Sequence, residues 1–462
     1  MHYSHSVAEL EIDRKPLVLV PQFFGSTVFD RRTSRYLPFD HEATNLLREM
    51  SIHPFEEVRA RWAFQETTER VTALERFFEK FTDLGFFTLE RRFAGDMLDV
   101  EVPADHLVGP LAVHLEVVSS CNLTCTHCFA GDLPRRERQL SLAELDSLFA
   151  QMAAMGSFRL GLTGGEPLLR RDLFDIIDLA TNHGLCPCIT TNGLLINEEV
   201  ARAFGARNPV WLNVSLEGAT AQTNDAIRGP GTFERVLDRL AILRQYSRFT
   251  LAFTIMSTNV TEIEQCAELA EKVGAATAVF RPLYPVGIAQ RHLDLMPTFE
   301  QYSDALARLE KGSDGGGFNL RHIDPFGPVS REPSQSVIYT NMGCGAGNLV
   351  CSISVSGDTN PCSFLGPDYV AGSIRDTPLI TLWHDSSGFR GIRALPGGNP
   401  CGSACHGHSS NGSFTGGCRA RALVLNGSIN APDPWLVSHG IGTAPHRRPL
   451  PLLTLELERH YR

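Results

Sequence analysis

Three cysteines in one short segment have the types and spacing needed to hold a metal centre. The segment CNLTCTHC places Cys121, Cys125 and Cys128 three and then two residues apart. It follows an apolar run that predicts a β-strand, so the thiols belong to a loop at the carboxyl end of that strand. Three thiolates suit a [4Fe–4S] cubane with one open iron, because most such clusters use four cysteines. A zinc site or unrelated cysteines are the alternatives to a cluster.

A second group of cysteines lies in a Gly-rich region toward the carboxyl terminus. It contains Cys344, Cys351, Cys362, Cys401, Cys405 and Cys418. Clustered thiols in a reducing compartment indicate metal or redox chemistry more than structural disulfides. A bound cluster would also help to explain how a region with few long apolar runs folds. The other three of the 12 cysteines, at positions 186, 188 and 266, are interpreted as small buried side chains.

Charge and hydropathy exclude several classes of protein. The 462 residues carry a formal net charge of −10, which argues against a nucleic-acid-binding protein because such proteins need a basic surface. No apolar run of about 18 residues predicts a membrane-spanning helix. The first residues lack the apolar core of a secretory signal. The sequence therefore predicts a cytoplasmic protein that binds neither nucleic acid nor membrane.

Strands and helices alternate from about residue 111 onward. Predicted strands are Leu111–Val118, Arg159–Thr163, Pro187–Thr191, Val210–Leu216, Thr250–Met256 and Ala276–Arg281. Predicted helices are Leu142–Met155, Asp172–His183, Glu198–Phe204, Phe233–Tyr246 and Val260–Val273. This alternation predicts a parallel sheet of six largely apolar strands, covered on both faces, with functional residues at the carboxyl ends.

The residues before this region predict a separate small module. Pro16–Phe24 is predicted to be a strand that Ser26–Asp30 continues after Gly25, and Phe86–Arg91 a further strand. Helices are expected over Asp40–Met50 and Val71–Leu84, which together suggest a winged-helix-like module. A generic α+β cap is the alternative. Residues 312–317 and 324–336 are expected to be linkers.

The first cysteine segment resembles the signature of the radical S-adenosylmethionine (SAM) superfamily. Further motifs follow successive predicted strands in that family's order: Gly164-Gly165-Glu166-Pro167, Thr191-Asn192, Ser215 with Glu217, and Arg228. The resemblance implies a [4Fe–4S] cluster whose open iron binds SAM. Reductive cleavage of SAM would then give methionine and a 5′-deoxyadenosyl radical that abstracts hydrogen from a substrate.

The same resemblance assigns roles to the motif residues. The backbone of Gly164–Pro167 would bind the methionine amino end, and Thr191 and Asn192 would reach the ribose. Ser215 and Arg228 would bind the methionine carboxylate, and Leu283 would face the adenine through its backbone. Glu217 stands where the family more often has Asp.

The second cysteine group resembles the SPASM domain, which binds auxiliary iron–sulfur clusters. The resemblance implies that Cys344, Cys351, Cys362 and Cys418 close one auxiliary [4Fe–4S] cluster. Thr415 and Leu436 stand where the full pattern has cysteines. Cys401 and Cys405 then have three interpretations. They are remnants of a lost second cluster, they hold a second cluster that His406 or His408 completes, or they bind zinc together with those histidines.

The expected fold class is α/β: a partial (β/α)6 radical SAM barrel with a winged-helix-like module before it and a Cys-rich SPASM/twitch-like domain after it. The expected bounds are 1–105 for the peptide-recognition module, 106–325 for the barrel, 326–440 for the SPASM-like domain and 441–462 for a C-terminal tail.

The resemblance also implies a substrate class. SPASM enzymes commonly modify ribosomally made peptides, and modules like the N-terminal one bind a leader peptide as an added strand on a sheet edge, here near Pro16–Phe24. The expected reaction is a peptide modification, with a carbon–carbon or thioether crosslink favoured over epimerisation or decarboxylation, and a flavodoxin or ferredoxin as reductant. A tetrapyrrole or small-cofactor maturase is the alternative within the family. A non-catalytic metal-cluster scaffold that binds peptides is the alternative outside it.

Overall fold

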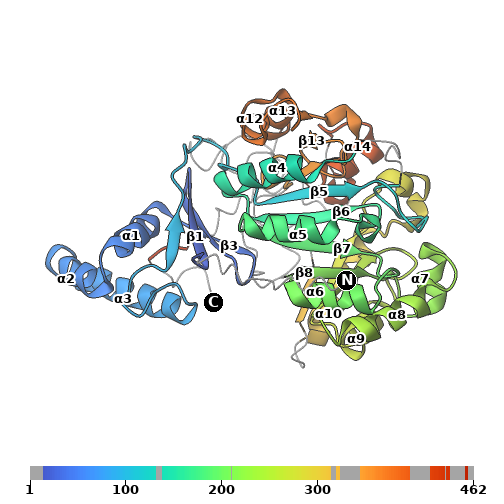
Figure 1. Cartoon of the computed structure of the whole chain (residues 1–462), viewed down its shortest axis with the longest axis horizontal. Coiled ribbons are helices and arrows are strands. Elements are labelled where there is room, and N and C mark those ends of the chain that lie inside the picture. The colour runs from blue at the N-terminus through green and yellow to red at the C-terminus, as the bar shows by residue number, and fades with distance from the viewer. Residues whose placement is uncertain are drawn as a thin grey trace, which may run out of the picture.

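The computed structural model describes residues 14–131, 138–209, 211–313, 319–322, 344–395, 417–431, 433–437 and 453–455. An N-terminal module stands at one side of a large, mainly parallel sheet, and a smaller C-terminal part lies beside the first strand of that sheet (Figure 1). Within the described residues, no helix is both long and apolar enough to cross a membrane.

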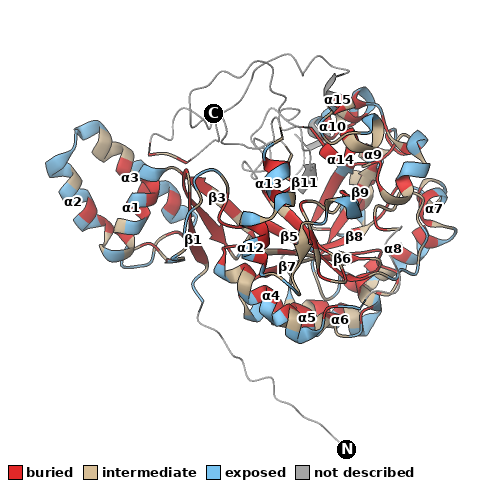
Figure 2. Cartoon of the chain, turned by 90° about the horizontal axis from the view of Figure 1, so that it is seen from above, coloured by how far each residue is buried: buried red, intermediate tan, exposed pale blue. Residues whose placement is uncertain are grey.

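The N-terminal module is a four-stranded sheet with three helices. The strand order is β3-β2-β1-β4, with β1 at Leu17–Gln22, β2 at Gly25–Asp30, β3 at Arg35–Phe39 and β4 at Gly95–Met97. The helices are α1 (His41–Ile52), α2 (Phe55–Gln65) and α3 (Thr68–Asp83). Alternate residues of β1 belong to two cores: Leu17 joins the core of the module itself, and Val18 joins the core of the large sheet. The small sheet is therefore buried on both faces (Figure 2).

Three expectations for this module were wrong. The first strand, β1, is not an edge strand, because β2 and β4 flank it and leave β3 and β4 at the edges. The segment at 26–30 does not continue β1 but returns antiparallel to it. Gly25 makes this return possible: its φ is +138°, and a Cβ there would lie 2.3 Å from the carbonyl oxygen of Phe39. No strand forms over 86–91, where Phe87 makes only an isolated bridge.

The six strands expected in the large sheet are all present and parallel. They are β5 (Ala112–Val118), β6 (Arg159–Gly164), β7 (Cys186–Thr191), β8 (Trp211–Ser215), β9 (Thr250–Ile255) and β10 (Thr277–Pro282). The connecting helices are α4 (Leu142–Ala154), α5 (Leu173–Asn182), α6 (Glu198–Arg207), α7 (Ala221–Arg228), α8 (Thr232–Leu243) and α9 (Ile263–Lys272). Strand alternation with helices of this length therefore identified the layer correctly, although α7 was not expected.

The sheet is wider than six strands. After α10 (Phe299–Ser313), β11 (Asn319–His322) pairs in parallel with β10. On the other side, β12 (Val350–Ile353) pairs in parallel with β5, followed by antiparallel β13 (Asp358–Asn360) and β14 (Gly372–Ser373). The C-terminal part is completed by α12 (Leu379–Asp385), α13 (Ser387–Arg393), α14 (Arg419–Asn426) and α15 (Pro434–Val437). The expected linker at 312–317 begins inside α10, and the one at 324–336 lies outside the described residues.

The two faces of this sheet differ in polarity, contrary to the expectation of apolar strands covered on both sides. Side chains such as Leu160, Leu212 and Leu251 are buried in the core with the helices. On β5, β7 and β10, the residues that follow core positions point to the opposite face and include His114, Thr190 and Arg281, which are not part of that core. Because successive side chains of a strand alternate between faces, polar residues on one face are compatible with a fully apolar core on the other.

Candidate active site

The cysteine loop follows β5 directly and is tied to elements on two sides. Its own turn is closed by the Cys128 amide, which donates to the carbonyl of Cys125 at 3.3 Å. The Thr126 amide donates to the carbonyl of Ile227 at the end of α7, and the Ile288 amide donates to that of Cys128. Cys121 is exposed, and the other two thiols of the loop are partly exposed. The loop is thus held by backbone hydrogen bonds while its thiols remain accessible.

The two glycines of the Gly164–Pro167 motif bring it against the root of this loop. The Gly165 amide donates to Val118 at 2.7 Å, and the Glu166 amide donates to Ser120 at 2.9 Å. A Cβ on Gly164 would lie 2.1 Å from the carbonyl oxygen of Val118, and one on Gly165 would lie 2.1 Å from that of Ser120. The close approach expected between this motif and a ligand is therefore also an approach to the cysteine loop itself.

Glu166 organises the next motif. Its carboxylate accepts hydrogen bonds from the Thr191 hydroxyl at 2.6 Å, the Asn192 amide at 2.7 Å and the Leu168 amide at 3.1 Å. Glu166 is 1% exposed, and burial raises its pKa. The side-chain amide of Asn192 in turn donates to Asn122 at 2.7 Å and lies 3.9 Å from the Cys121 sulfur. One buried carboxylate thus positions Asn192 beside the cysteine loop.

A buried cluster of charged residues contacts the cysteine loop at His127, away from the Asn192 contact at Cys121. The Glu217 carboxylate accepts from Arg228 Nη2 at 2.6 Å, from His127 Nε2 at 3.0 Å and from the Thr254 amide at 2.9 Å. Burial by itself would raise the pKa of Glu217, but the charges and hydrogen bonds of His127 and Arg228 outweigh it and hold this pKa well below its usual range. Since His127 lies between the second and third cysteines, this ion pair reaches the loop directly.

The other predicted SAM-binding residues lie around the same edge. Ser215 ends β8, partly exposed. Leu283 follows β10, and its amide donates to the carbonyl of Ile255 at 3.1 Å. The predicted pocket residues therefore lie at or just beyond the carboxyl ends of successive strands, except Arg228, which ends α7 and reaches the site through Glu217.

Two further polar residues lie on the face of the large sheet opposite its helix-covered core. His114 of β5 and Arg281 of β10 both contact solvent. Surrounding protein atoms nevertheless desolvate His114 and lower its pKa to about 4, so its imidazole is neutral near pH 7. Desolvation also lowers the pKa of Arg281, which forms no ion pair with any described residue. A charged or histidine residue inside an otherwise apolar strand was the sequence signal that could have found both.

The thiols of the loop fit an iron–sulfur cluster. Burial raises the pKa of Cys125 to about 11 and also raises that of Cys128. Such thiols become thiolates only beside a strong positive charge, which cluster iron supplies. Among the described residues, no three Cys, His, Asp or Glu side chains lie close enough to share one metal ion. A four-iron cubane holds its thiolates farther apart than a single ion does.

The structure brings together three of the four cysteines expected around the auxiliary cluster. Cys344, Cys362 and Cys418 belong to one apolar cluster and affect one another electrostatically. Cys351 does not join them: it is fully buried in the core of the large sheet, and Arg393 is the charge that acts on it. The reason is its place in β12, where its side chain points to the helix-covered face. Cys401 and Cys405 lie outside the described residues.

Cys418 is held by a second buried ion pair. It is the N-cap of α14, and its amide donates to Asp433 at 2.6 Å. The Arg421 Nε donates to the same carboxylate at 3.0 Å, and both side chains are 0% exposed. Trp435 packs on the Arg421 guanidinium at 3.7 Å. The motifs around residues 418 and 433, which are 15 positions apart in the chain, therefore form one support for this thiol.

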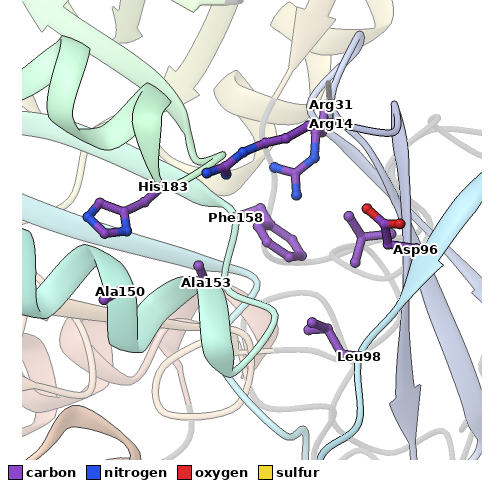
Figure 3. Close-up of a pocket in the computed structure, with 9 residues that line it drawn as sticks. Arg14, Arg31, Asp96, Leu98, Ala150, Ala153, Phe158 and His183 are labelled. Atoms are coloured by element: carbon purple, nitrogen blue, oxygen red, sulfur yellow. The ribbon is translucent and has the colours of Figure 1, made fainter. Parts of the chain in front are cut away.

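A separate cavity of about 320 Å³ lies between the N-terminal module and the large sheet (Figure 3). Arg14, Arg31, Asp96, Phe158 and His183 are among its lining residues. Phe158 precedes the amino end of β6, whereas the Gly164–Pro167 motif is at the carboxyl end of that strand. This cavity is therefore not part of the cysteine site.

Comparisons with known proteins agree with this geometry. The profile of the radical SAM superfamily matches residues 115–273, and the SPASM profile, an iron–sulfur cluster-binding domain, matches residues 344–407. Mycofactocin maturase MftC of Mycobacterium tuberculosis is 33% identical over 341 residues, which cover 72% of this chain and 84% of the relative. The AdoMet-dependent heme synthase of Methanosarcina barkeri is 29% identical over 351 residues, which cover 71% and 96%.

A solved structure shows the same fold over nearly the whole chain. Streptococcus suis SuiB bound to its precursor peptide SuiA superposes with a TM-score of 0.63 at 15% identity, covering 91% of this chain and 98% of that chain. Together with the cysteine loop and the ordered motifs around it, the identity to the maturase settles the family. This chain belongs to the radical SAM superfamily and is a radical SAM enzyme with a C-terminal SPASM domain.

Proposed function

We propose that this enzyme cleaves SAM and abstracts hydrogen from a ribosomally made peptide, installing a post-translational modification for which a carbon–carbon or thioether crosslink is favoured. The observation that carries the proposal is the N-terminal module: one face of its sheet shares a core with the catalytic sheet, its three helices pack on the other face, and the sheet presents an edge suited to an extended peptide. A winged-helix-like recognition role for this module is part of the proposal. The similarity to a mycofactocin maturase supports the proposed modifying function.

The cysteine loop would hold the SAM-binding cluster. When bound, that cluster supplies the electron that cleaves SAM. Cys121, Cys125 and Cys128 ligate it, and Asn192 borders the first of these thiols, close enough to orient a ligand there. Glu217 holds Arg228 and His127 in fixed positions beside the loop, so that the guanidinium N–H groups of Arg228 that Glu217 does not engage would donate to the methionine carboxylate.

The auxiliary site would accept or relay an electron. Cys344, Cys362 and Cys418 provide three thiolates for a [4Fe–4S] cluster, which suits a modification that is a net oxidation of the peptide. A flavodoxin or ferredoxin would supply the electron for SAM cleavage. The division of the chain near residues 105, 325 and 440 belongs to the same proposal.

A tetrapyrrole maturase is the second candidate. It is supported by the 29% identity to an AdoMet-dependent heme synthase, which covers 96% of that relative. The two candidates differ in substrate but share SAM cleavage. A non-catalytic scaffold, the candidate of another class, has no need for the ordered motifs around the cysteine loop.

One experiment separates all three. The anaerobically reconstituted enzyme is incubated with SAM, a reductant and either the peptide encoded by a short reading frame beside its gene or an iron-tetrapyrrole. The proposal expects 5′-deoxyadenosine and a peptide mass change of about −2 Da for a crosslink. Product from the tetrapyrrole alone would favour the second candidate. Equal 5′-deoxyadenosine from a variant with all three loop cysteines changed to Ala would refute radical SAM chemistry at this loop.

A further inference from the structure

The outer edge of the N-terminal sheet carries a segment from far along the chain. Leu453 forms a parallel bridge with Phe39 at the edge strand β3. Its amide donates to the carbonyl of Pro38 at 2.8 Å, and its own carbonyl accepts from the Asp40 amide at 3.3 Å. Residues 453–455 therefore lie against the module at the other end of the chain, joined to its outer edge strand by a single β-bridge (Figure 1).

Two leucines of this segment anchor it in the core of the module. Leu453 is 4% exposed and Leu455 is 3% exposed. Both belong to the apolar cluster formed by Phe39, by α1 and by α3, which contributes Phe77 and Phe81. Because alternate residues of a strand point to the same side, Leu453 and Leu455 enter the cluster together while Thr454 between them stays partly exposed.

The edge around Phe39 offers a defined pair of hydrogen-bonding groups to its partner. Along a strand, the N–H and C=O of one residue point to the same side, and Pro38 has no N–H to offer. The outward-facing groups around Phe39 are thus the Pro38 carbonyl and the Asp40 amide, and Leu453 uses both. A peptide that binds here must donate to Pro38, accept from Asp40 and place aliphatic side chains two residues apart. These are the features of residues 453–455.

We propose that residues 453–455 are a built-in occupant of the peptide-binding edge of the N-terminal module, which a precursor peptide must displace. The inference rests on the proposed peptide-modifying function and adds what the edge recognises: an extended segment with two branched aliphatic residues in an i, i+2 pattern. A tethered segment acts at an effective concentration of the order of millimolar. A segment that binds the edge with a dissociation constant of its own of about 0.1 mM or tighter therefore weakens any competing peptide by about tenfold or more.

The test uses the full-length reconstituted enzyme and a defined probe, a fluorescein-labelled peptide with the sequence of residues 450–459 (LPLLTLELER). Its binding is measured by fluorescence anisotropy to the wild type, to the double variant Leu453→Asp/Leu455→Asp, and to the matched control Thr454→Ala. The double variant should bind the probe at least tenfold more tightly than the wild type and the control do. A probe with Asp at both leucine positions should not bind.

Hydrogen exchange checks that the double variant is folded and that the edge is the site. Exchange should speed up over β3 and at Asp40 in the variant and slow down again when the probe is added, with the strands of the large sheet unchanged. Equal probe binding by wild type and double variant would overturn the inference, as would no binding by either. A wild-type dimer that the double substitution dissociates would also overturn it, because the segment would then cross between copies. Absence of 5′-deoxyadenosine in every variant would instead count against the proposed function, since the binding assay does not depend on it.

Discussion

The buried ionic cluster at Glu217 offers the sharpest test of how the cysteine loop is held. The substitution Glu217→Gln keeps the size of the side chain but removes the charge that faces Arg228 and His127. The side chains of Glu217 and Arg228 are only 2% and 7% exposed, so water cannot replace the lost partner. An uncompensated guanidinium then remains beside the loop.

The expected cost follows from this burial. Two unit charges about 4 Å apart attract by about 4 kcal/mol at an effective dielectric constant of about 20. Removing one partner of a buried pair typically costs about 3 to 5 kcal/mol of stability. We therefore expect Glu217→Gln to lower the free energy of unfolding of the large sheet by about 3 to 5 kcal/mol, and the double variant Glu217→Gln/Arg228→Met to recover more than half of that loss.

The assay is urea unfolding near pH 7.5 followed by tryptophan fluorescence, to which Trp211 of β8 contributes. The matched control is Glu198→Gln, which removes the carboxylate from an exposed ion pair with Arg202 (62% exposed on both sides) and should cost less than about 1 kcal/mol. If Glu217→Gln is as mild as this control, or if the double variant is no more stable than the single one, the ionic cluster does not support the loop and the reasoning fails.

Three further predictions concern the auxiliary cysteines, the carboxylate of Glu166 and an ion pair at the start of α4. Because Cys351 lies apart from the auxiliary thiols, Cys418→Ala should lower the iron content from about eight to about four per chain, whereas Cys351→Ala should leave it unchanged; iron assay after anaerobic reconstitution decides between them. The change Glu166→Gln replaces an acceptor by a donor facing the Asn192 amide or the Thr191 hydroxyl, so SAM should bind about tenfold more weakly in equilibrium dialysis, and unchanged affinity would contradict the role given to Glu166. The Arg375 guanidinium and the Ser141 amide lower the pKa of Glu144 to about 2. Because solvent screens this ion pair, Glu144→Gln should lower the free energy of unfolding by only about 1 kcal/mol. Since this pKa is depressed, the cost should be constant from about pH 8 to about pH 5 and shrink as the pH falls from about 4.5 toward 2; a thermal-unfolding gap that widens in acid would be inconsistent with it.

The parts of this protein that were predictable from its sequence are local or periodic. The spacing of three thiols and the alternation of strands with helices depend on residues near one another in the chain; they predicted a cysteine loop directly after β5 and the six parallel strands that the structure contains. The order of the motifs then placed Gly164, Asn192 and Ser215 at neighbouring strand ends. This step needed only the rule that parallel strands end at one edge of their sheet.

Two features that the sequence could not show depend on a distant partner. The pattern of β1 is apolar on both faces, and it could not show that β4, more than 70 residues later, would pair with β1 and move the edge to β3. The position of Cys351 depends on β12 pairing with β5, which turns its side chain away from the other auxiliary thiols. In each case the decisive hydrogen bonds form between segments far apart in sequence.

The sequence by itself therefore determined the chemistry of the cysteine loop and the order of the elements that carry it, because ligand type, spacing and hydrophobic period are properties of the chain. The tertiary structure decided what each residue supports. Glu166 supports the Thr191–Asn192 turn, Glu217 supports the cysteine loop by its contact with His127, and Leu453 covers the edge of the N-terminal sheet. The physical reason is that buried charges and strand edges take whichever partners the packed fold brings to them, and those partners are not neighbours in the chain.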